Sequence, residues 1–173
     1  AFLPMVMTLR MEMAIMQDPN DSEKNALVFL SLITGLFIVA SCLITSLFFA
    51  DELKLEIILI VLCAFFASIN NMAVSIANLK ERYWAISISR LLFPILFFVI
   101  VFLSKDVSML YPLATSHMFA SFLGAIFMVK ASSYTVKIAS FKEVICVLQQ
   151  NFNYIKFDLP SNIFNVSSLL LPA

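Results

Sequence analysis

Two arginines and one glutamate lie in segments that are otherwise apolar enough to enter a lipid bilayer. Arg10 and Glu12 stand two residues apart at the end of one such segment, and Arg90 lies more than a helical turn inside another. A charge inside a membrane is costly, and it usually lines a cavity or meets a partner. A permanent cation in a cavity of low dielectric constant would bind an anionic group. The alternative is that each arginine reaches to the lipid headgroups and that Glu12 is structural.

The local geometry around these charges leads to two further expectations. Positions i and i+2 do not face each other on a helix, so we expect Arg10 and Glu12 to meet other partners rather than one another. Pro94 follows Arg90 by four residues and cannot donate a hydrogen bond to its carbonyl group, which predicts a kink in that helix. The kink would leave a backbone carbonyl free beside a cation, as occurs where a transmembrane helix lines a cavity.

Uncharged polar residues form a second group of candidates. Asn71, Ser75 and Asn78 share one helix face at i, i+4 and i+7, so Asn71 is predicted either to line water or to hydrogen-bond to a neighbouring helix. His117 lies near the face of Ser121 and is a candidate for proton or ion coupling, with a hydrogen-bonded structural role as the alternative. A stripe of small residues predicts close helix packing rather than chemistry; it consists of Ser116, Ala120 and Gly124.

The remaining reactive residues do not form an enzyme motif. The chain has one histidine, no pair of carboxylates on one membrane face, and only two glycines, which excludes a glycine-rich phosphate loop from these residues. The cysteines lack the spacing of a metal site or a disulfide; they are Cys42, Cys63 and Cys146. We therefore predict a protein that is not an enzyme and that binds neither a metal nor a cofactor.

The composition explains what must position these residues. The chain is 62% hydrophobic and 13% charged, whereas an ordinary soluble domain is about 25% charged. A core built from 173 residues could not hide so much apolar surface, so part of it must face lipid. The net charge of zero argues against a nucleic-acid partner. The predicted fold class is all-α, a polytopic bundle of transmembrane helices.

Apolar runs and helix signals divide the chain into predicted spans. The segment 26–49 has no charge, and at 1.5 Å per residue its length of about 36 Å exceeds a hydrocarbon core of about 30 Å. Asp18 is predicted to cap the start of this helix, with Pro19 at its first position. Further complete spans are expected at 55–78, 84–104 and 110–129. Partial spans at 1–16 and 158–173 suggest an internal piece of a longer membrane protein.

Lysine and arginine residues are distributed unequally between the two ends of these spans. Only Lys54 and Lys105 of the eleven cations lie in the alternate short connections. Because cations near span ends are retained on the cytoplasmic side, the other end is predicted to be cytoplasmic. The nine cations at that end are Arg10, Lys24, Lys80, Arg82, Arg90, Lys130, Lys137, Lys142 and Lys156.

A polar segment at 130–157 interrupts the sequence of spans and is predicted to be a cytoplasmic loop. Within it, Ser140 and Glu143 have the spacing of a capping box, which predicts an amphipathic helix at 140–150. The apolar residues at helical spacing should share one face toward lipid or protein on the inner leaflet; they are Phe141, Val144, Ile145 and Leu148.

Three short motifs occur in the order found in one family of transporters. They are Arg10-x-Glu12-x-Ala14-Ile15, the run from Lys80 to Arg90, and Tyr154-Ile-Lys-Phe-Asp-Leu-Pro160. With these motifs the sequence resembles the polysaccharide-biosynthesis flippases of the O-antigen transporter type, in the multidrug/oligosaccharidyl-lipid/polysaccharide exporter superfamily. Met11 stands where that family usually has an aromatic residue. The resemblance spans nearly the whole chain.

This resemblance implies both a position in a larger fold and a function. The residues would correspond to late helix two through early helix seven of a bundle of about twelve to fourteen helices. The implied activity is translocation of an undecaprenyl-pyrophosphate-linked oligosaccharide across the bacterial inner membrane by alternating access, for O-antigen, capsule or exopolysaccharide synthesis. Membrane lipids and other polysaccharide-assembly proteins are the further partners it implies.

A doubly anionic pyrophosphate needs cations in a cavity of low dielectric constant, and the charged residues are the candidates to supply them. Arg10 and Arg90 would bind the pyrophosphate, with Glu12 orienting one of them or taking part in ion coupling. Asn71 would line the cavity and His117 is a candidate for ion coupling.

Three alternatives follow from the same residues. A drug or cation exporter of the same superfamily would need a cavity lined by acids, which the spans almost lack. A membrane glycan polymerase would need a large outer loop, and the connections at 50–54 and 104–109 are short. A purely structural membrane subunit is the third.

Overall fold

The computed structural model describes residues 2–17, 20–48, 51–103, 109–158 and 160–161, and the regular structure of these residues is entirely helical. Four long helices dominate, and each is long and apolar enough to cross a membrane. The chain is therefore an all-α bundle of membrane-spanning type, as predicted. The long helices are α3 (Asp21–Ser46), α4 (Asp51–Leu79), α5 (Tyr83–Leu103) and α6 (Leu110–Ala131).

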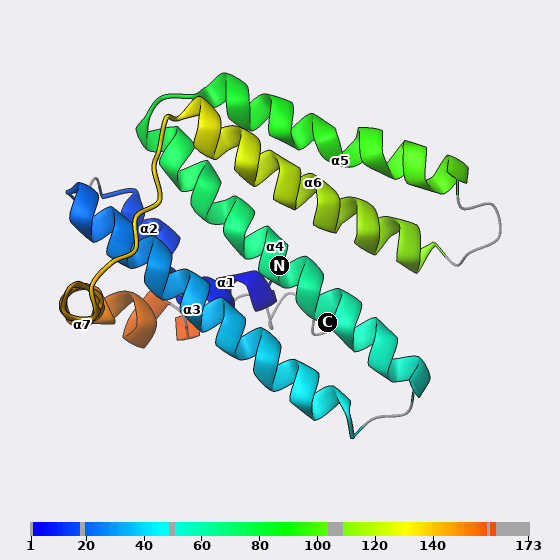
Figure 1. Cartoon of the computed structure of the whole chain (residues 1–173), viewed down its shortest axis with the longest axis horizontal. Helices are drawn as coiled ribbons and strands as arrows, with labels where there is room; N and C mark the ends of the chain where they lie inside the picture. Colours follow the sequence, from blue (N-terminus) through cyan, green and yellow to red (C-terminus); the bar gives the residue numbers. More distant parts are fainter. Residues whose placement is uncertain (1, 18–19, 49–50, 104–108, 159, 162–173) are drawn as a thin grey trace.

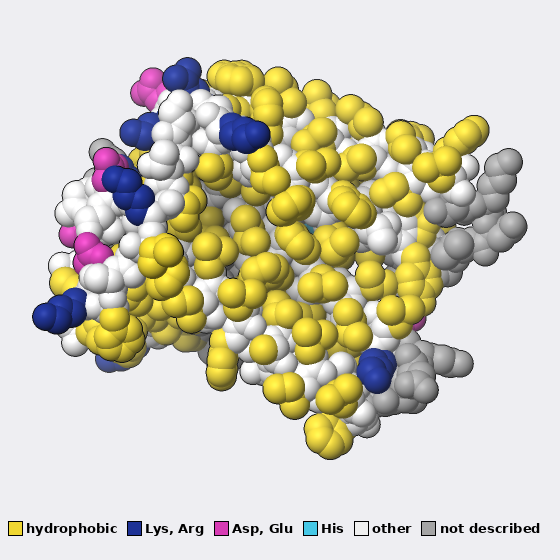
Figure 2. All heavy atoms as spheres, in the orientation of Figure 1, with side chains coloured by type: hydrophobic (Ala, Val, Ile, Leu, Met, Phe, Trp, Pro, Cys, Tyr) yellow, Lys and Arg dark blue, Asp and Glu magenta, His cyan; other side chains and the backbone are white. Residues whose placement is uncertain are grey.

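The four long helices run antiparallel to their neighbours in the chain, and α4 lies at the centre of the arrangement (Figure 1). Helix α4 packs against α6 and α3, and α5 packs mainly against α6. Large apolar side chains project outward from the bundle, such as Phe37 and Phe98, each 72% exposed. Figure 2 shows apolar side chains over the visible face of the long helices, while most charged side chains gather at the end where α4 turns into α5.

Helix α3 begins at Asn20 rather than at the predicted Asp18. The side chain of Asn20 accepts a hydrogen bond of 2.9 Å from the backbone N–H of Glu23, and Asp21 and Glu23 occupy the first turn. Asn20 is as good a cap as aspartate, and acidic residues in the first turn oppose the positive end of the helix dipole. Asp18 and Pro19 lie outside the described residues.

The predicted first span at 1–16 is interrupted. Helix α1 (Phe2–Thr8) and helix α2 (Met11–Ile15) are separated by Leu9 and Arg10. Their φ angles are 49° and 61°, which places both residues in the left-handed region. This conformation costs about 1–2 kcal/mol per residue. Tertiary packing compensates for this strain. The side chains around the break are almost completely buried; they are Met7, Thr8, Met11 and Ile15.

Helix α7 (Phe141–Gln150) is the predicted amphipathic helix, and both hydrogen bonds of its capping box are formed. Its buried face is rotated from the predicted one. Val144 and Val147 are 8% and 2% exposed and join the core cluster built on α2 and α3, whereas Phe141 is 78% exposed. Leu148 packs against the same cluster. Phe141 and Ile145 are exposed on the bundle, so the prediction that the whole face is directed toward lipid or protein stays a prediction.

Hydrogen bonds join the segment before α7 to the beginning of α3. The side-chain oxygen of Asn25 accepts from the hydroxyl of Tyr134 at 2.8 Å and from the backbone N–H of Lys137 at 3.1 Å. The hydroxyl of Ser22 donates to Glu143 Oε1 at 2.6 Å. The long polar connection is thereby held against the cation-rich end of the bundle.

The final predicted span can be followed only at its start. A π-helix at Tyr154–Asp158 contacts α2, and residues 160–161 are helical. The remainder of the predicted span at 158–173 lies outside the described residues, as does Lys105.

Candidate functional site

A cavity of about 330 Å³ lies among α4, α5 and α6 and combines polar and apolar walls. Helix α5 contributes Ser89, Arg90 and Phe93, and helix α6 contributes His117 and Ser121. Two residues that the sequence singled out separately, Arg90 and His117, thus line one space. Asn70 from α4 and Ala120 from α6 complete the lining.

Arg90 supplies the cavity with a permanent positive charge. Within the described ranges, with their gaps at 18–19, 49–50, 104–108, 159 and 162–173, no acidic side chain lies within ion-pair distance of its guanidinium. Arg90 is an exposed residue of the described structure; where lipid or protein covers it, its charge would attract an anion more strongly than in water. Helix α5 continues through Pro94, and the predicted kink at that position stays a prediction.

The imidazole of His117 is held from two sides. Its Nδ1 lies 3.4 Å from the hydroxyl of Ser121, one turn further along α6. The ring meets Phe93 of α5 edge to face, with 5.6 Å between ring centroids. These contacts orient the ring at the wall of the cavity that Arg90 lines.

Asn70 lines the cavity in place of the predicted Asn71. Its Oδ1 is buried and has no hydrogen-bond partner among the described residues. Asn71 is exposed on another side of α4, where its backbone carbonyl accepts a hydrogen bond from Ser75. One residue along a helix turns the side chain by about 100°, so Asn70 lines this cavity and Asn71 does not. The spacing of Asn70 with Ala73 and Ala77, both buried against α6, is the signal that identifies this face.

Small residues bring α6 close to the polar wall. Ser116, Ala120 and Gly124 are buried, which confirms their predicted role in packing. A Cβ atom on Gly124 would lie 3.1 Å from Ser89 Cβ and 3.2 Å from Asn70 Oδ1. Since those distances are shorter than ordinary contacts, a side chain at residue 124 would require Ser89 or Asn70 to shift by a few tenths of an ångström.

Arg10 and Glu12 form a separate pair at the break between α1 and α2. Arg10 Nη1 lies 3.5 Å from Glu12 Oε1, and the two side chains are 19% and 11% exposed. The expectation that they would meet other partners is wrong because Arg10 lies outside the helix, in the left-handed conformation. Arg10 Nε and Glu12 Oε2 are buried with no hydrogen-bond partner in the described part of the chain. Neither residue lines the cavity of Arg90.

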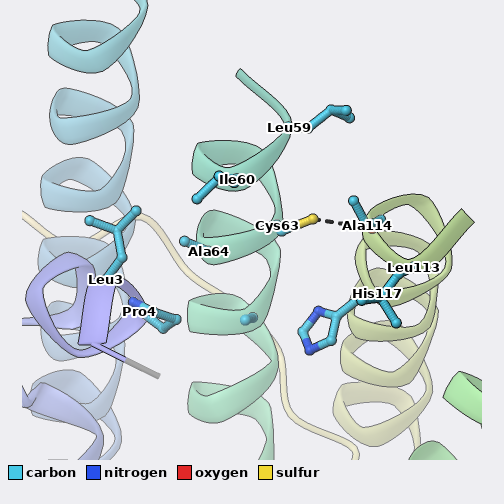
Figure 3. Close-up of a pocket in the computed structure, with 10 residues that line it drawn as sticks. Leu3, Pro4, Leu59, Ile60, Cys63, Ala64, Leu113, Ala114 and His117 are labelled. Carbon is cyan, nitrogen blue, oxygen red and sulfur yellow. Dashed lines mark hydrogen bonds between the residues drawn. The ribbon is translucent and has the colours of Figure 1, made fainter. Parts of the chain in front are cut away.

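A second cavity, of about 350 Å³, lies between α1, α4 and α6 (Figure 3). Leucine, isoleucine, alanine and proline side chains form most of its wall, and His117 forms part of it as well. The Cys63 thiol at this wall donates to the carbonyl of Ala114 at 3.1 Å. The described residues contain no group of three histidine, cysteine or acidic side chains placed to hold a metal ion.

No protein-family model, curated protein or solved structure matches this chain. The functional assignment therefore rests on the chemistry of the cavities and on the three sequence motifs.

Proposed function

We propose that this protein translocates an undecaprenyl-pyrophosphate-linked oligosaccharide across the bacterial inner membrane by alternating access. The observation that carries the proposal is Arg90, a cation in a cavity between membrane-spanning helices with no acidic partner among the described residues. The resemblance of the three motifs to O-antigen flippases supports the same substrate. The resulting glycan would enter O-antigen, capsule or exopolysaccharide synthesis, together with other polysaccharide-assembly proteins.

The cavity residues are suited to a pyrophosphate group. Arg90 would bind its oxygens with two parallel hydrogen bonds, a geometry that favours arginine over lysine. The amide group of Asn70 on α4 offers a further donor, whereas the hydroxyl of Ser89 already donates to the carbonyl of Ile86 at 3.1 Å. His117 would add charge when protonated, which makes it the candidate for ion coupling.

Alternating access requires the helices around the site to move relative to one another. At Arg10 the backbone departs from a regular helix, and within α5 Pro94 lacks the N–H that would donate a helical hydrogen bond. Arg10 and Glu12 would then act at the moving boundary, with Glu12 orienting the arginine. Such irregular segments are typical of helices that change shape during transport.

The rival functions differ in the residues they need. A cation exporter needs acidic side chains in the cavity, and no acid lines the cavity of Arg90 among the described residues. A glycan polymerase needs residues for bond formation, and the cavity offers one histidine without a neighbouring carboxylate. The anionic substrate is therefore the better match.

The test replaces Arg90 in a bacterial strain whose surface glycan depends on this protein. We expect Arg90→Ala to abolish glycan display at normal membrane levels and Arg90→Lys to keep part of it, because the charge survives. Pro94→Ala should give a milder defect. Arg82→Ala serves as the control, since Arg82 lies at the turn before α5 and does not line the cavity. Full display from Arg90→Ala would contradict the proposal, and loss of resistance to cationic drugs instead would favour the exporter.

A further inference from the structure

The polar and apolar cavities meet at one side chain, His117 of α6. Leu113 and Ala114 line the apolar cavity, whereas Ala120 and Ser121 line the polar one. His117 lines both. Figure 3 shows its ring projecting from α6 toward α4, beside the apolar wall. A molecule that occupied both cavities would therefore pass directly over this ring.

The two cavities differ sharply in chemistry. The polar one contains the cation of Arg90 with the amide of Asn70 and the hydroxyl of Ser89. The apolar one is walled by hydrocarbon from three helices, and the Cys63 thiol at its wall donates to a backbone carbonyl. The apolar wall includes Leu3, Pro4, Ile60, Ala67 and Leu113. A ligand that matches both must carry an anion at one end and a hydrocarbon chain at the other.

The order of the cavities along the helices matches the order of groups within a lipid leaflet. Arg90 lies seven residues after Tyr83, the first residue of α5, which is about 10 Å along the helix at 1.5 Å per residue. This part of α5 is near the end of the bundle where cations gather. The α4 residues of the apolar cavity, 59–67, lie near the middle of the helix Asp51–Leu79. A lipid of the inner leaflet has its phosphate near the membrane surface and its chain toward the bilayer centre. The polar and apolar cavities follow one another in the same order.

We propose that the two cavities form a single site for an anionic polyprenyl lipid, with its phosphate groups on Arg90 and the adjoining part of its chain in the apolar cavity. The inference rests on the proposed function for the identity of the lipid as a glycan carrier. The chain gains little hydrophobic energy when it moves from bilayer to cavity. Its role is to fix where the phosphate sits, so a blocked cavity would move the phosphate away from Arg90.

The first test compares binding of two probes to the purified full-length protein in phosphatidylcholine nanodiscs. The probes are undecaprenyl diphosphate and inorganic pyrophosphate. Ala67→Phe should fill the apolar cavity and weaken undecaprenyl diphosphate binding by about tenfold or more, while pyrophosphate binding stays unchanged. Arg90→Ala should weaken both. Ala40→Phe is the matched control, because Ala40 is exposed on α3. Equal lipid binding by Ala67→Phe and the unaltered protein would overturn the proposal.

The second test needs no substitution in the site. In a variant whose only cysteine is Cys63, made by Cys42→Ala and Cys146→Ala, an apolar maleimide should label the thiol slowly at alkaline pH. Undecaprenyl diphosphate should protect Cys63 at least tenfold, and inorganic pyrophosphate should not. Absence of protection by the lipid would overturn the shared site even if Ala67→Phe were misfolded.

These measurements separate the site from the transport function. If Cys63 is protected and Ala67→Phe binds the lipid poorly, the lipid site stands even where Arg90→Ala cells display full glycan, and only the proposed translocation falls. If Arg90→Ala abolishes display but Cys63 is unprotected, the transport role stands and the chain site is wrong.

Discussion

The guanidinium of Arg10 and the carboxylate of Glu12 lie 3.5 Å apart although two positions so spaced cannot face each other along a helix. The left-handed conformation of Arg10, with φ 61°, turns its side chain back over the first turn of α2. The pair is mostly buried, and one oxygen of Glu12 has no hydrogen-bond partner among the described residues. Removing the cation alone would leave a buried carboxylate without its charged partner.

A double-mutant cycle on this pair should show favourable coupling. Arg10→Ala and Glu12→Gln should each destabilise the protein, and the double variant should lose less than their sum, by about 0.5–3 kcal/mol. Thermal unfolding in detergent, followed by thiol exposure, measures the effect, with Arg82→Ala as the exposed control. Strict additivity of the two losses would show that the pair contributes no interaction energy.

Gly124 should tolerate no large side chain. Gly124→Leu would push atoms into Ser89 and Asn70, and such overpacking typically destabilises by about 1–3 kcal/mol. Ala40→Leu on the exposed face of α3 should leave the unfolding temperature nearly unchanged. A Gly124→Leu protein as stable as the control would show that α5 and α6 are not in close contact there.

The two faces of α7 should respond differently to a charge. Val147→Asp places a carboxylate at a buried position and should weaken docking of α7 by at least about 2 kcal/mol. Ile145→Asp, at a 39% exposed position, should change it by less than about 0.5 kcal/mol. Hydrogen exchange of the α7 amides reports docking directly. Equal loss of protection in both variants would contradict the observed face.

Acid should loosen the contact between α7 and α3. The hydroxyl of Ser22, followed by the backbone and the hydroxyl of Ser140, holds the pKa of Glu143 below its ordinary value. A carboxylate whose pKa is lower in the folded protein than in the unfolded chain stabilises the fold. The stabilisation is fully present above the pKa of the unfolded chain, about 4.3. It is lost as the pH falls through the pKa of the folded state. Ser22→Ala should raise the Glu143 pKa in an NMR titration, whereas Ser41→Ala should not. An unchanged pKa in Ser22→Ala would remove Ser22 as its cause.

The charge distribution predicts which ends of the helices face the cytoplasm. In a cysteine-free background, Lys80→Cys and Lys142→Cys should be labelled only from inside, and Lys54→Cys only from outside. The measurement is modification of intact cells by a membrane-impermeant maleimide, with lysed cells as the control. Labelling of residues 54 and 80 from the same side would show that the topology is wrong.

Several features of the fold depend only on residues that are close together in the chain. Four long helices, their approximate limits and the capping box of Ser140 all follow from uninterrupted apolar runs and from residues within one turn of each other. Each feature depends on neighbours in the chain, so no knowledge of the fold is needed. The asymmetric placement of lysine and arginine is equally local.

Which side chains meet depends on how the helices pack against one another. The choice of Asn70 over Asn71 depends on which face of α4 touches α6, and the buried stripe of α7 depends on where α3 lies. The pairing of Arg10 with Glu12 requires a strained backbone that surrounding packing maintains. Arg90 and His117 line the same cavity because α5 and α6 pack together. The spacing of residues within either helix does not specify that contact.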